Sequence, residues 1–578
     1  MAHTAPLSDA PAHHRWWPKG VPHALRVPRV TLPHYLQTAA ARYPDKPALI
    51  FADTFISYDE LDRRVQAVAA YLQQRMAVNP GDRVLLISQN CPQYVVCFYA
   101  ILTVGAVVVP VNPMSTLQEV RYFMQDGGAR VACVAQELLG QVQPLMEGVS
   151  PQASAADNTA LSSVLVHAYA DHLSPEAVAC LPPAMQAPFV PLHHEGLHAH
   201  AQACAYSTPL QPVAVSCEDL AVLPYTSGTT GHPKGCCHNH QSILASNLAS
   251  QVWRNLHVDS VFLCVAPLFH MLGMQNGMNV PLTLGATVVM LPRWDAQRAL
   301  EAVERHRVSV WAAPPAMVMD FFAQPEANTR DLSSLTVLSG GGAAMPEAVA
   351  TRLWEQFGLS YNEAYGLTET ASFLHANPIA RGKRQCLGMP SQGVESIIVD
   401  PQTLQPLPVG EVGELLTRGP QLMQGYWRNE AANREAFVEV AGKRFFRTGD
   451  LALVDEEGYF FMRDRLKRMI NASGFKVWPA EVESIMYAHP AVLEACVIAS
   501  PDVKRGETVL ALVVLKPQVT MSEEDLLAWC REAMATYKAP RLIRFVEQLP
   551  KSGTGKILWR ELQAQEHDRV GALSNPTR

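Results

Sequence analysis

The chain has 578 residues and a mass of 63.4 kDa, which is more than one hydrophobic core usually serves, so at least two domains are expected. With 48% hydrophobic residues, 17% charged residues and a mean hydropathy of +0.01, the composition is that of a globular protein. The net charge of −7 argues against a nucleic-acid partner, because no basic excess is available to neutralise phosphates.

The cysteines and the first residues indicate a cytoplasmic protein. The twelve cysteines include no CxxC pair, which is typical of reduced thiols that serve as small core residues. The first twenty residues lack the apolar stretch of a secretory signal. Loose contact with a membrane surface and assembly as a homodimer are both compatible with this sequence.

Residues 94–111, YVVCFYAILTVGAVVVPV, are uncharged over a length that approaches a membrane span. A buried helix over residues 92–104, a stop at Gly105 and a short buried strand over residues 106–111 explain the run better. We therefore expect no integral membrane segment.

Short apolar runs alternate with helical patterns along most of the chain, which predicts the α/β class with layered sheets. The strand-like runs are DRVLLIS, GAVVVPV, ARVACVA, GATVVMLP, RVSVWAAPP and LTVLSGGG. We expect a large N-terminal domain of several subdomains over residues 1–463. A small, mobile α+β domain, with helix, strand, strand and helix signals in that order, is expected over residues 464–578.

Residues of about 140–215 are rich in Pro, Ala, Ser and His, and this composition predicts a surface excursion between two subdomains. Four histidines there could be imagined as metal ligands. Because no carboxylate or cysteine set completes a site, a solvated loop is the better interpretation. The histidines are His193, His194, His198 and His200.

The segment LPYTSGTTGHPKG, residues 223–235, suits the binding of phosphate groups. It is not a Walker loop, since GxxxxGK[ST] does not fit. Its glycines let backbone N–H groups approach oxyanions, its hydroxyls donate hydrogen bonds, and Lys234 adds a positive charge. The hydroxyls and glycines are those of Thr226, Ser227, Gly228, Thr229, Thr230 and Gly231.

This segment resembles the phosphate-binding loop of the adenylate-forming superfamily, which includes acyl-CoA synthetases, peptide-synthetase adenylation domains and firefly-type luciferases. Three further segments resemble that superfamily in the same order: NEAYGLTET at 362–370, FRTGDLALVDEEGYFFMRDRLKRMINASGFKVWPAEVE at 446–483, and LPKSGTGKILWREL at 549–562. The resemblance covers about residues 30–565.

The resemblance implies a site for Mg·ATP. Tyr365 would stack on adenine, Thr368 would contact the α-phosphate and Glu369 would hold Mg²⁺, and each residue type suits its task. Asp450 would accept hydrogen bonds from both ribose hydroxyls. Arg465 would lie near ribose and phosphate, Lys467 would be the hinge, and Gly366 and Lys476 would complete the nucleotide contacts.

Lys556 is implied as the catalytic lysine, which the small domain carries into the active site for adenylation. A mobile ammonium in a site that excludes water can bridge the substrate carboxylate and the α-phosphate.

The resemblance also implies which segments bind coenzyme A and the acid, although it assigns fewer individual contacts to them. In INASGFK, Ser473 and Gly474 would lie beside coenzyme A, although some relatives have lysine where Asn471 stands. His270, counted among the catalytic candidates, would lie at the mouth of the acyl pocket. The glycine loop that would form the floor of this pocket is Gly340, Gly341 and Gly342.

Together these features predict an ATP-dependent ligase that activates a carboxylic acid as acyl-AMP and transfers the acyl group to coenzyme A. No cationic side chain is evident in the pocket segments, so a medium- or long-chain fatty acid is the first choice and an aryl acid the second. The alternatives are an acyl-AMP ligase that serves a carrier protein, and an inactive binding protein. The last is disfavoured because every matched catalytic residue is present.

Overall fold

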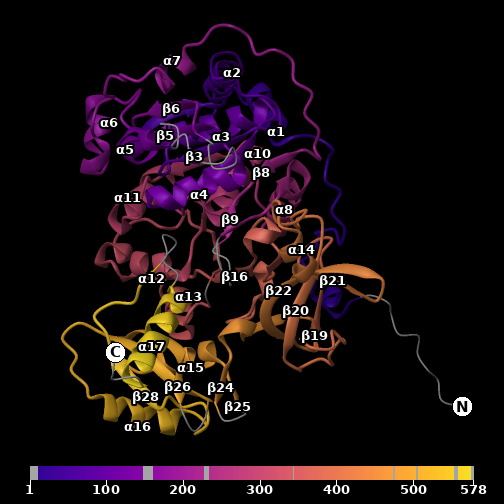
Figure 1. Cartoon of the computed structure of the whole chain (residues 1–578), viewed down its shortest axis with the longest axis vertical. Helices are drawn as coiled ribbons and strands as arrows, with labels where there is room; N and C mark the ends of the chain where they lie inside the picture. Colours follow the sequence, from indigo (N-terminus) through magenta and orange to yellow (C-terminus); the bar gives the residue numbers. More distant parts are fainter. Residues whose placement is uncertain are drawn as a thin grey trace, which may run out of the picture.

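The computed structural model describes residues 11–146, 160–226, 233–342, 344–472, 475–502, 506–551 and 557–574. Two large sheets form the N-terminal part, a third sheet lies beside them, and a small domain lies at one end of the molecule, in orange to yellow in Figure 1. This is the α/β architecture that the alternating runs predict.

The first large sheet has seven strands in the order β11-β8-β4-β3-β5-β6-β7. All its neighbours are parallel except β11 and β8. The strands are β3 (Arg83–Ile87), β4 (Val107–Val111), β5 (Val131–Ala135), β6 (Ser163–His167), β7 (Leu197–Ala199), β8 (Leu220–Val222) and β11 (His238–Asn239).

The second large sheet has nine strands in the order β18-β17-β16-β15-β14-β12-β13-β1-β2, with a parallel centre and antiparallel edges. Its strands are β1 (Pro47–Phe51), β2 (Thr54–Ser57), β12 (Val261–Cys264), β13 (Thr287–Met290), β14 (Val310–Ala312), β15 (Val337–Gly340), β16 (Tyr361–Tyr365), β17 (His375–Ala376) and β18 (Met389–Pro390). The six apolar runs are confirmed as strands β3, β4, β5, β13, β14 and β15.

Helices cover these sheets. The longer ones are α1 (Leu32–Arg42), α2 (Tyr58–Arg75), α3 (Pro92–Thr103), α4 (Leu117–Gly127), α8 (His240–Trp253), α11 (Ala296–His306), α12 (Pro315–Ala323) and α13 (Glu347–Phe357). Between α8 and β13, the chain forms a short helix α9 (Met271–Gly273), a π-helical turn η5 (Met274–Asn279) and α10 (Val280–Leu284).

The apolar run at residues 94–111 is divided as predicted, between helix α3 and strand β4. Residues 92–102 of α3 are all buried, which explains why the run carries no charge. In the part of the chain that the structure describes, no helix has the length and apolar character that a membrane crossing requires.

The expected surface excursion at 140–215 is partly wrong, because this segment adds β6 and β7 to the seven-stranded sheet. His193 and His194 are exposed, as expected. His200 is buried, and His198 Nδ1 lies 3.0 Å from the hydroxyl oxygen of Tyr71. The apolar run SVLVH of β6 is a strand signal that the surrounding Pro, Ala and His conceal.

The third sheet, orange in Figure 1, has five antiparallel strands. They are β19 (Glu395–Val399), β20 (Gly413–Arg418), β21 (Phe437–Val440), β22 (Lys443–Val454) and β23 (Phe460–Arg465). Helix α14 (Glu430–Ala436) precedes β21. Strand β23 leads through a single 3-10 turn, η9 (Leu466–Arg468), into the small domain.

The small domain surrounds its own apolar core with a five-stranded sheet and three helices within its described residues. Its elements are β24 (Ile470–Ala472), β25 (Phe475–Val477), α15 (Pro479–Met486), β26 (Val492–Asp502), β27 (Gly506–Leu515), α16 (Glu523–Ala533), β28 (Leu542–Phe545) and α17 (Trp559–Ser574). The predicted order of helix, strand, strand and helix is found as α15, β26, β27 and α16, whereas β24, β25, β28 and α17 were not predicted.

Candidate active site

The two ends of the phosphate-loop motif form a short antiparallel ladder, β9 (Tyr225–Thr226) with β10 (Lys234–Gly235). Thr226 pairs directly with Lys234. The Tyr225 hydroxyl donates to Asp126 Oδ2 over 2.6 Å, and the Tyr122 hydroxyl donates to the carbonyl of Pro233 over 2.7 Å. The base of the loop is therefore fixed to α4, while the predicted contacts Ser227, Gly228, Thr229, Thr230 and Gly231 lie outside the described residues.

The second motif, at residues 362–370, is docked directly beside the first. The carbonyl of Thr368 lies 2.8 Å from His238 Nε2, and the carbonyl of Glu369 accepts from the Met423 amide over 2.8 Å. A side chain at Gly366 would overlap the carbonyl of Ser372, so only glycine fits there. These contacts bring Thr368 to His238, three residues beyond the phosphate-loop motif, and Glu369 to Met423.

Tyr426 links two of the predicted site residues and was not itself predicted. Its hydroxyl donates to Glu369 Oε1 over 2.9 Å, and Lys234 Nζ lies 5.1 Å from the centre of its ring. Burial raises the pKa of the Glu369 carboxyl, with smaller opposing effects from its hydrogen bonds. No sequence spacing could have shown this link, since Tyr426 and Glu369 are 57 residues apart.

Asp450, Tyr365 and Arg465 form the third part of the site. Asp450 is 1% exposed, and its Oδ2 accepts from the Tyr365 hydroxyl over 2.6 Å. Its Oδ1 lies 3.1 Å from Arg465 Nε. The Asp450 carboxylate raises the pKa of the Arg465 guanidinium, and burial raises the pKa of the Tyr365 hydroxyl. The three predicted nucleotide contacts are therefore brought together, with Oδ2 hydrogen-bonded to Tyr365 and Oδ1 in an ion pair with Arg465 but without a hydrogen bond among the described residues.

The connection to the small domain follows Arg465 directly. Asp464 is buried, and its Oδ2 accepts from the Ala480 amide at the start of α15 over 2.8 Å. The backbone of Lys467 belongs to η9, in the middle of this connection. Ser473, Gly474 and Lys556 lie outside the described residues, and so does the side chain of Lys476.

The expected acyl-pocket residues come from two adjoining regions. His270 is exposed, and its Nδ1 accepts from the Leu272 amide over 3.2 Å at the start of α9. A side chain at Gly340 would overlap the carbonyl of Ala313 and the hydroxyl of Tyr361, and one at Gly341 would overlap the carbonyl of Ala364. Gly342 follows with a φ of +89°. The glycine loop is therefore packed closely against β14 and β16.

The structure also places a cation beside these segments, which sequence reasoning missed. Arg254, just after α8, is 6% exposed, and its Nη1 donates to Asn276 Oδ1 over 2.7 Å. Asn276 belongs to the π-helical turn that follows His270 and α9. A single arginine at the end of a mostly apolar helix gives no sequence signal of this contact.

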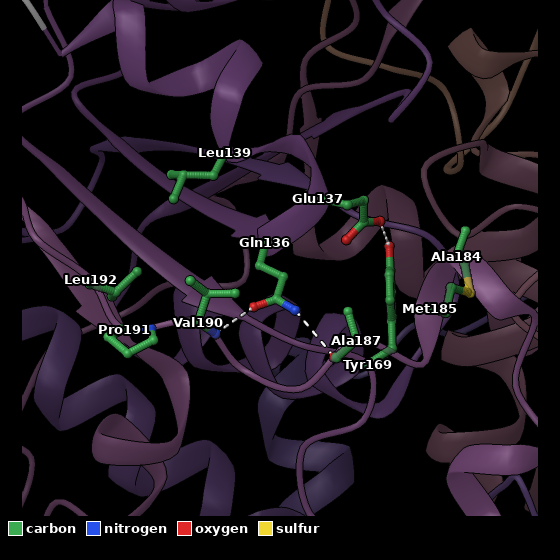
Figure 2. A pocket seen from close by; sticks show the side chains of 10 residues that line it. All are labelled: Gln136, Glu137, Leu139, Tyr169, Ala184, Met185, Ala187, Val190, Pro191 and Leu192. Atoms are coloured by element: carbon green, nitrogen blue, oxygen red, sulfur yellow. Dashed lines mark hydrogen bonds between the residues drawn. The ribbon is translucent and has the colours of Figure 1, made fainter.

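Figure 2 shows a cavity of about 310 Å³ in a different part of the molecule. Its lining comes only from residues between 136 and 192, and Tyr169 donates to Glu137 Oε1 over 2.6 Å. None of the predicted site residues lines it, so this cavity is separate from the site built above.

Comparisons with known proteins agree with this geometry. The family of AMP-binding enzymes matches residues 36–427, and the AMP-binding enzyme C-terminal domain matches residues 481–556. The chain therefore belongs to the AMP-binding, adenylate-forming enzyme family, as the four motifs predict.

Similar proteins include CoA ligases for different acids. The long-chain-fatty-acid–CoA ligase of Bacillus subtilis (strain 168) is 32% identical over 560 residues, 95% of this chain and 97% of that protein. The feruloyl-CoA synthase of an Amycolatopsis species is 33% identical over 523 residues, 90% of this chain and 96% of that protein. The crystal structure of the anthranilate CoA ligase AuaEII in complex with anthranoyl-AMP matches with a TM-score of 0.80 at 26% identity, over 95% of this chain and 99% of that one.

The chain is an acid–thiol ligase that joins a carboxylic acid to coenzyme A through an acyl-adenylate, with ATP and Mg²⁺.

Proposed function

We propose that the acid is a medium- or long-chain fatty acid. The observation that carries this proposal is the apolar segment after His270, in which Met271, Met274 and Met278 are all buried. Unbranched methionine side chains adapt their shape to a flexible apolar tail. The similarity to long-chain-fatty-acid–CoA ligases over nearly the whole chain supports the same choice.

The residues of the site suit the first half-reaction. The substrate carboxylate would attack the α-phosphorus of ATP and displace pyrophosphate. Lys234 and the glycine-rich loop would hold the phosphates, Asp450 would hold the ribose, and Lys556 would bridge the carboxylate and the α-phosphate.

Glu369 would hold Mg²⁺. A half-buried carboxylate oriented by the Tyr426 hydroxyl is the hard oxygen ligand that this ion prefers. When bound, Mg²⁺ neutralises charge on the phosphate oxygens.

The second half-reaction requires a different set of residues. The thiol of coenzyme A would attack the acyl carbon, and AMP would leave. We propose that the small domain turns about Lys467, which removes Lys556 from the site and brings Ser473 and Gly474 to coenzyme A.

The experiment is a panel of acids tested with ATP, Mg²⁺ and coenzyme A, in which AMP formed is measured. Saturated fatty acids of eight to sixteen carbons should give kcat/KM values at least tenfold above those of ferulate, benzoate and anthranilate. Higher values for the aryl acids would contradict the proposal. Such a result would instead favour the second candidate, an aryl acid. The 33% identity to a feruloyl-CoA synthase supports this candidate.

A further inference from the structure

Arg254 is a buried cation that the catalytic site does not use. Among the residues that the structure describes, its guanidinium makes one hydrogen bond, to Asn276 Oδ1, and it lies 5.2 Å from the centre of the Phe373 ring. Among the described residues, no carboxylate forms an ion pair with it. Burial lowers the pKa of Arg254 to about 10, as expected for a buried cation without an anion beside it.

An arrangement of this kind is costly unless something compensates the charge. A buried ion is tolerated when it is paired and its hydrogen-bonding groups are satisfied. One amide oxygen and one aromatic face are the partners found among the described residues for a guanidinium with five N–H donors. The missing partner is therefore an acceptor, and an anion would suit it best.

Two further polar side chains on α8 have no hydrogen-bond partner within the described part of the chain. Asn247 is 0% exposed, and neither its amide oxygen nor its amide nitrogen has a hydrogen-bond partner. The buried hydroxyl of Ser250 has none either. Residues 247, 250 and 254 follow helical spacing and share one face of the helix. We call these three residues the α8 seam.

The α8 seam adjoins both segments that carry the expected acyl pocket. Asn276, which contacts Arg254, also donates from Nδ2 to the carbonyl of Leu272, two residues after His270. On the other side, the Tyr361 hydroxyl interacts electrostatically with Arg254 and fills the space left by the missing side chain of Gly340. Arg254 is therefore linked to the segment after His270 through Asn276, and it interacts electrostatically with Tyr361 beside the glycine loop.

We propose that the α8 seam binds a second carboxylate at the far end of the acyl substrate, so that the preferred acid is an aliphatic dicarboxylic acid. The proposal rests on the proposed function, because it specifies the fatty acid further. Arg254 would bind the distal carboxylate with its planar fork, and Asn247 and Ser250 would donate to the remaining oxygen positions. The reacting carboxylate would stay at the adenylate end of the pocket.

The test compares acids in matched pairs of equal carbon number, such as dodecanoate with dodecanedioate and octanoate with octanedioate. For each pair, kcat/KM is measured as AMP formed in the presence of coenzyme A. The wild-type enzyme should favour the dicarboxylate by about tenfold or more at the best chain length, because a site with buried polar groups rejects the analogue that leaves them unpaired. A preference for the monocarboxylate at every length would overturn the proposal.

The variant Arg254→Met should remove the preference while it leaves the monocarboxylate reaction within about threefold, and the change should fall mainly on KM. If Arg254→Met does not fold, Arg254→Gln serves, since its amide can still donate to Asn276 but carries no charge. Arg434→Met, at an exposed arginine of α14, is the matched control and should leave both acids unchanged. An equal loss for both acids in Arg254→Met or Arg254→Gln would mean that Arg254 only supports the fold.

The two proposals fail in different ways. If no aliphatic acid of either kind gives AMP, the proposed function is wrong. If monocarboxylates react well and dicarboxylates do not, only the assignment of the α8 seam is wrong.

Discussion

The hydroxyl of Tyr365 donates to Asp450 Oδ2 over 2.6 Å, and this contact joins two motifs that are 85 residues apart in sequence. In the same place Arg465 pairs with the other carboxylate oxygen. The carboxylate proposed to hold ribose thus has one hydrogen bond and one ion pair before nucleotide arrives, and a ribose hydroxyl would replace the Tyr365 hydroxyl as its donor.

Tyr365→Phe tests this exchange of partners. The variant leaves a buried carboxylate oxygen without its donor, which costs about 1–3 kcal/mol in the ligand-free enzyme. A ribose hydroxyl can replace the lost donor, so the rise in melting temperature on addition of ATP should be larger in the variant than in the wild type. Tyr459→Phe, at a buried tyrosine that donates to the Arg381 carbonyl, is the control. An unchanged or smaller ATP effect in Tyr365→Phe would show that ribose does not bind Asp450.

Tyr426→Phe tests the bridge between the phosphate loop and the proposed Mg²⁺ ligand. The change removes the hydrogen bond to Glu369 and keeps the ring beside Lys234. The hydrogen bond contributes about 1 kcal/mol, so the Mg²⁺ concentration at half-maximal rate should rise about fivefold with little change in the KM for coenzyme A. Equal changes in both values would contradict a local effect on the ion.

Gly366→Ala tests the close packing under Thr368 and Glu369. The new methyl group would overlap the carbonyl of Ser372, so the segment must shift and adenylation should fall by at least a hundredfold. Gly140→Ala is the control, because a methyl group there meets no atom within 4 Å. Near-normal pyrophosphate exchange in Gly366→Ala would show that this segment does not position the nucleotide.

A pH effect is expected from the N-terminal arm, where His13 lies on a 3-10 turn against the backbone of Gly458. Burial, with smaller contributions from His14 and His23, lowers the pKa of His13 from 6.5 to about 4. The unfolded chain therefore binds a proton that the native arm does not. The stability that neutral His13 provides is complete above pH 6.5 and is lost as pH falls toward 4.

The measurement is the melting temperature of the wild type and of His13→Phe between pH 8 and pH 4. The wild type should lose more stability over this range than the variant, because phenylalanine does not titrate. Parallel curves would show that His13 is not held in its neutral form.

The sequence predicts the sheets well because many of their strands are short continuous apolar runs, some of them bounded by glycine. GAVVVPV and LTVLSGGG become β4 and β15 for this reason. The strand β6 was missed because its five residues lie within a region of loop-like composition.

The site was predictable only as far as its motifs extend. Thr226 pairs with Lys234, and Tyr426 links Lys234 to Glu369, so these predicted residues lie in one region, while their roles stay predictions. Tyr426 and Arg254 belong to none of these motifs, and their roles depend on contacts that only the folded chain creates. The expectation that the acyl-pocket segments carry no cationic side chain stays a prediction, and Arg254 contacts Asn276 from outside those segments.

The central claim is that Lys556 acts in the adenylation half-reaction and not in thioester formation. One comparison tests this claim most directly. In Lys556→Ala, exchange of labelled pyrophosphate into ATP with a fatty acid should fall by at least a hundredfold. Thioester formation from supplied acyl-AMP and coenzyme A should stay within about threefold of the wild type, because the lysine would have left the site before that step. An equal loss in both reactions would contradict a lysine that acts only in adenylation and a small domain that exchanges it for the coenzyme A loop.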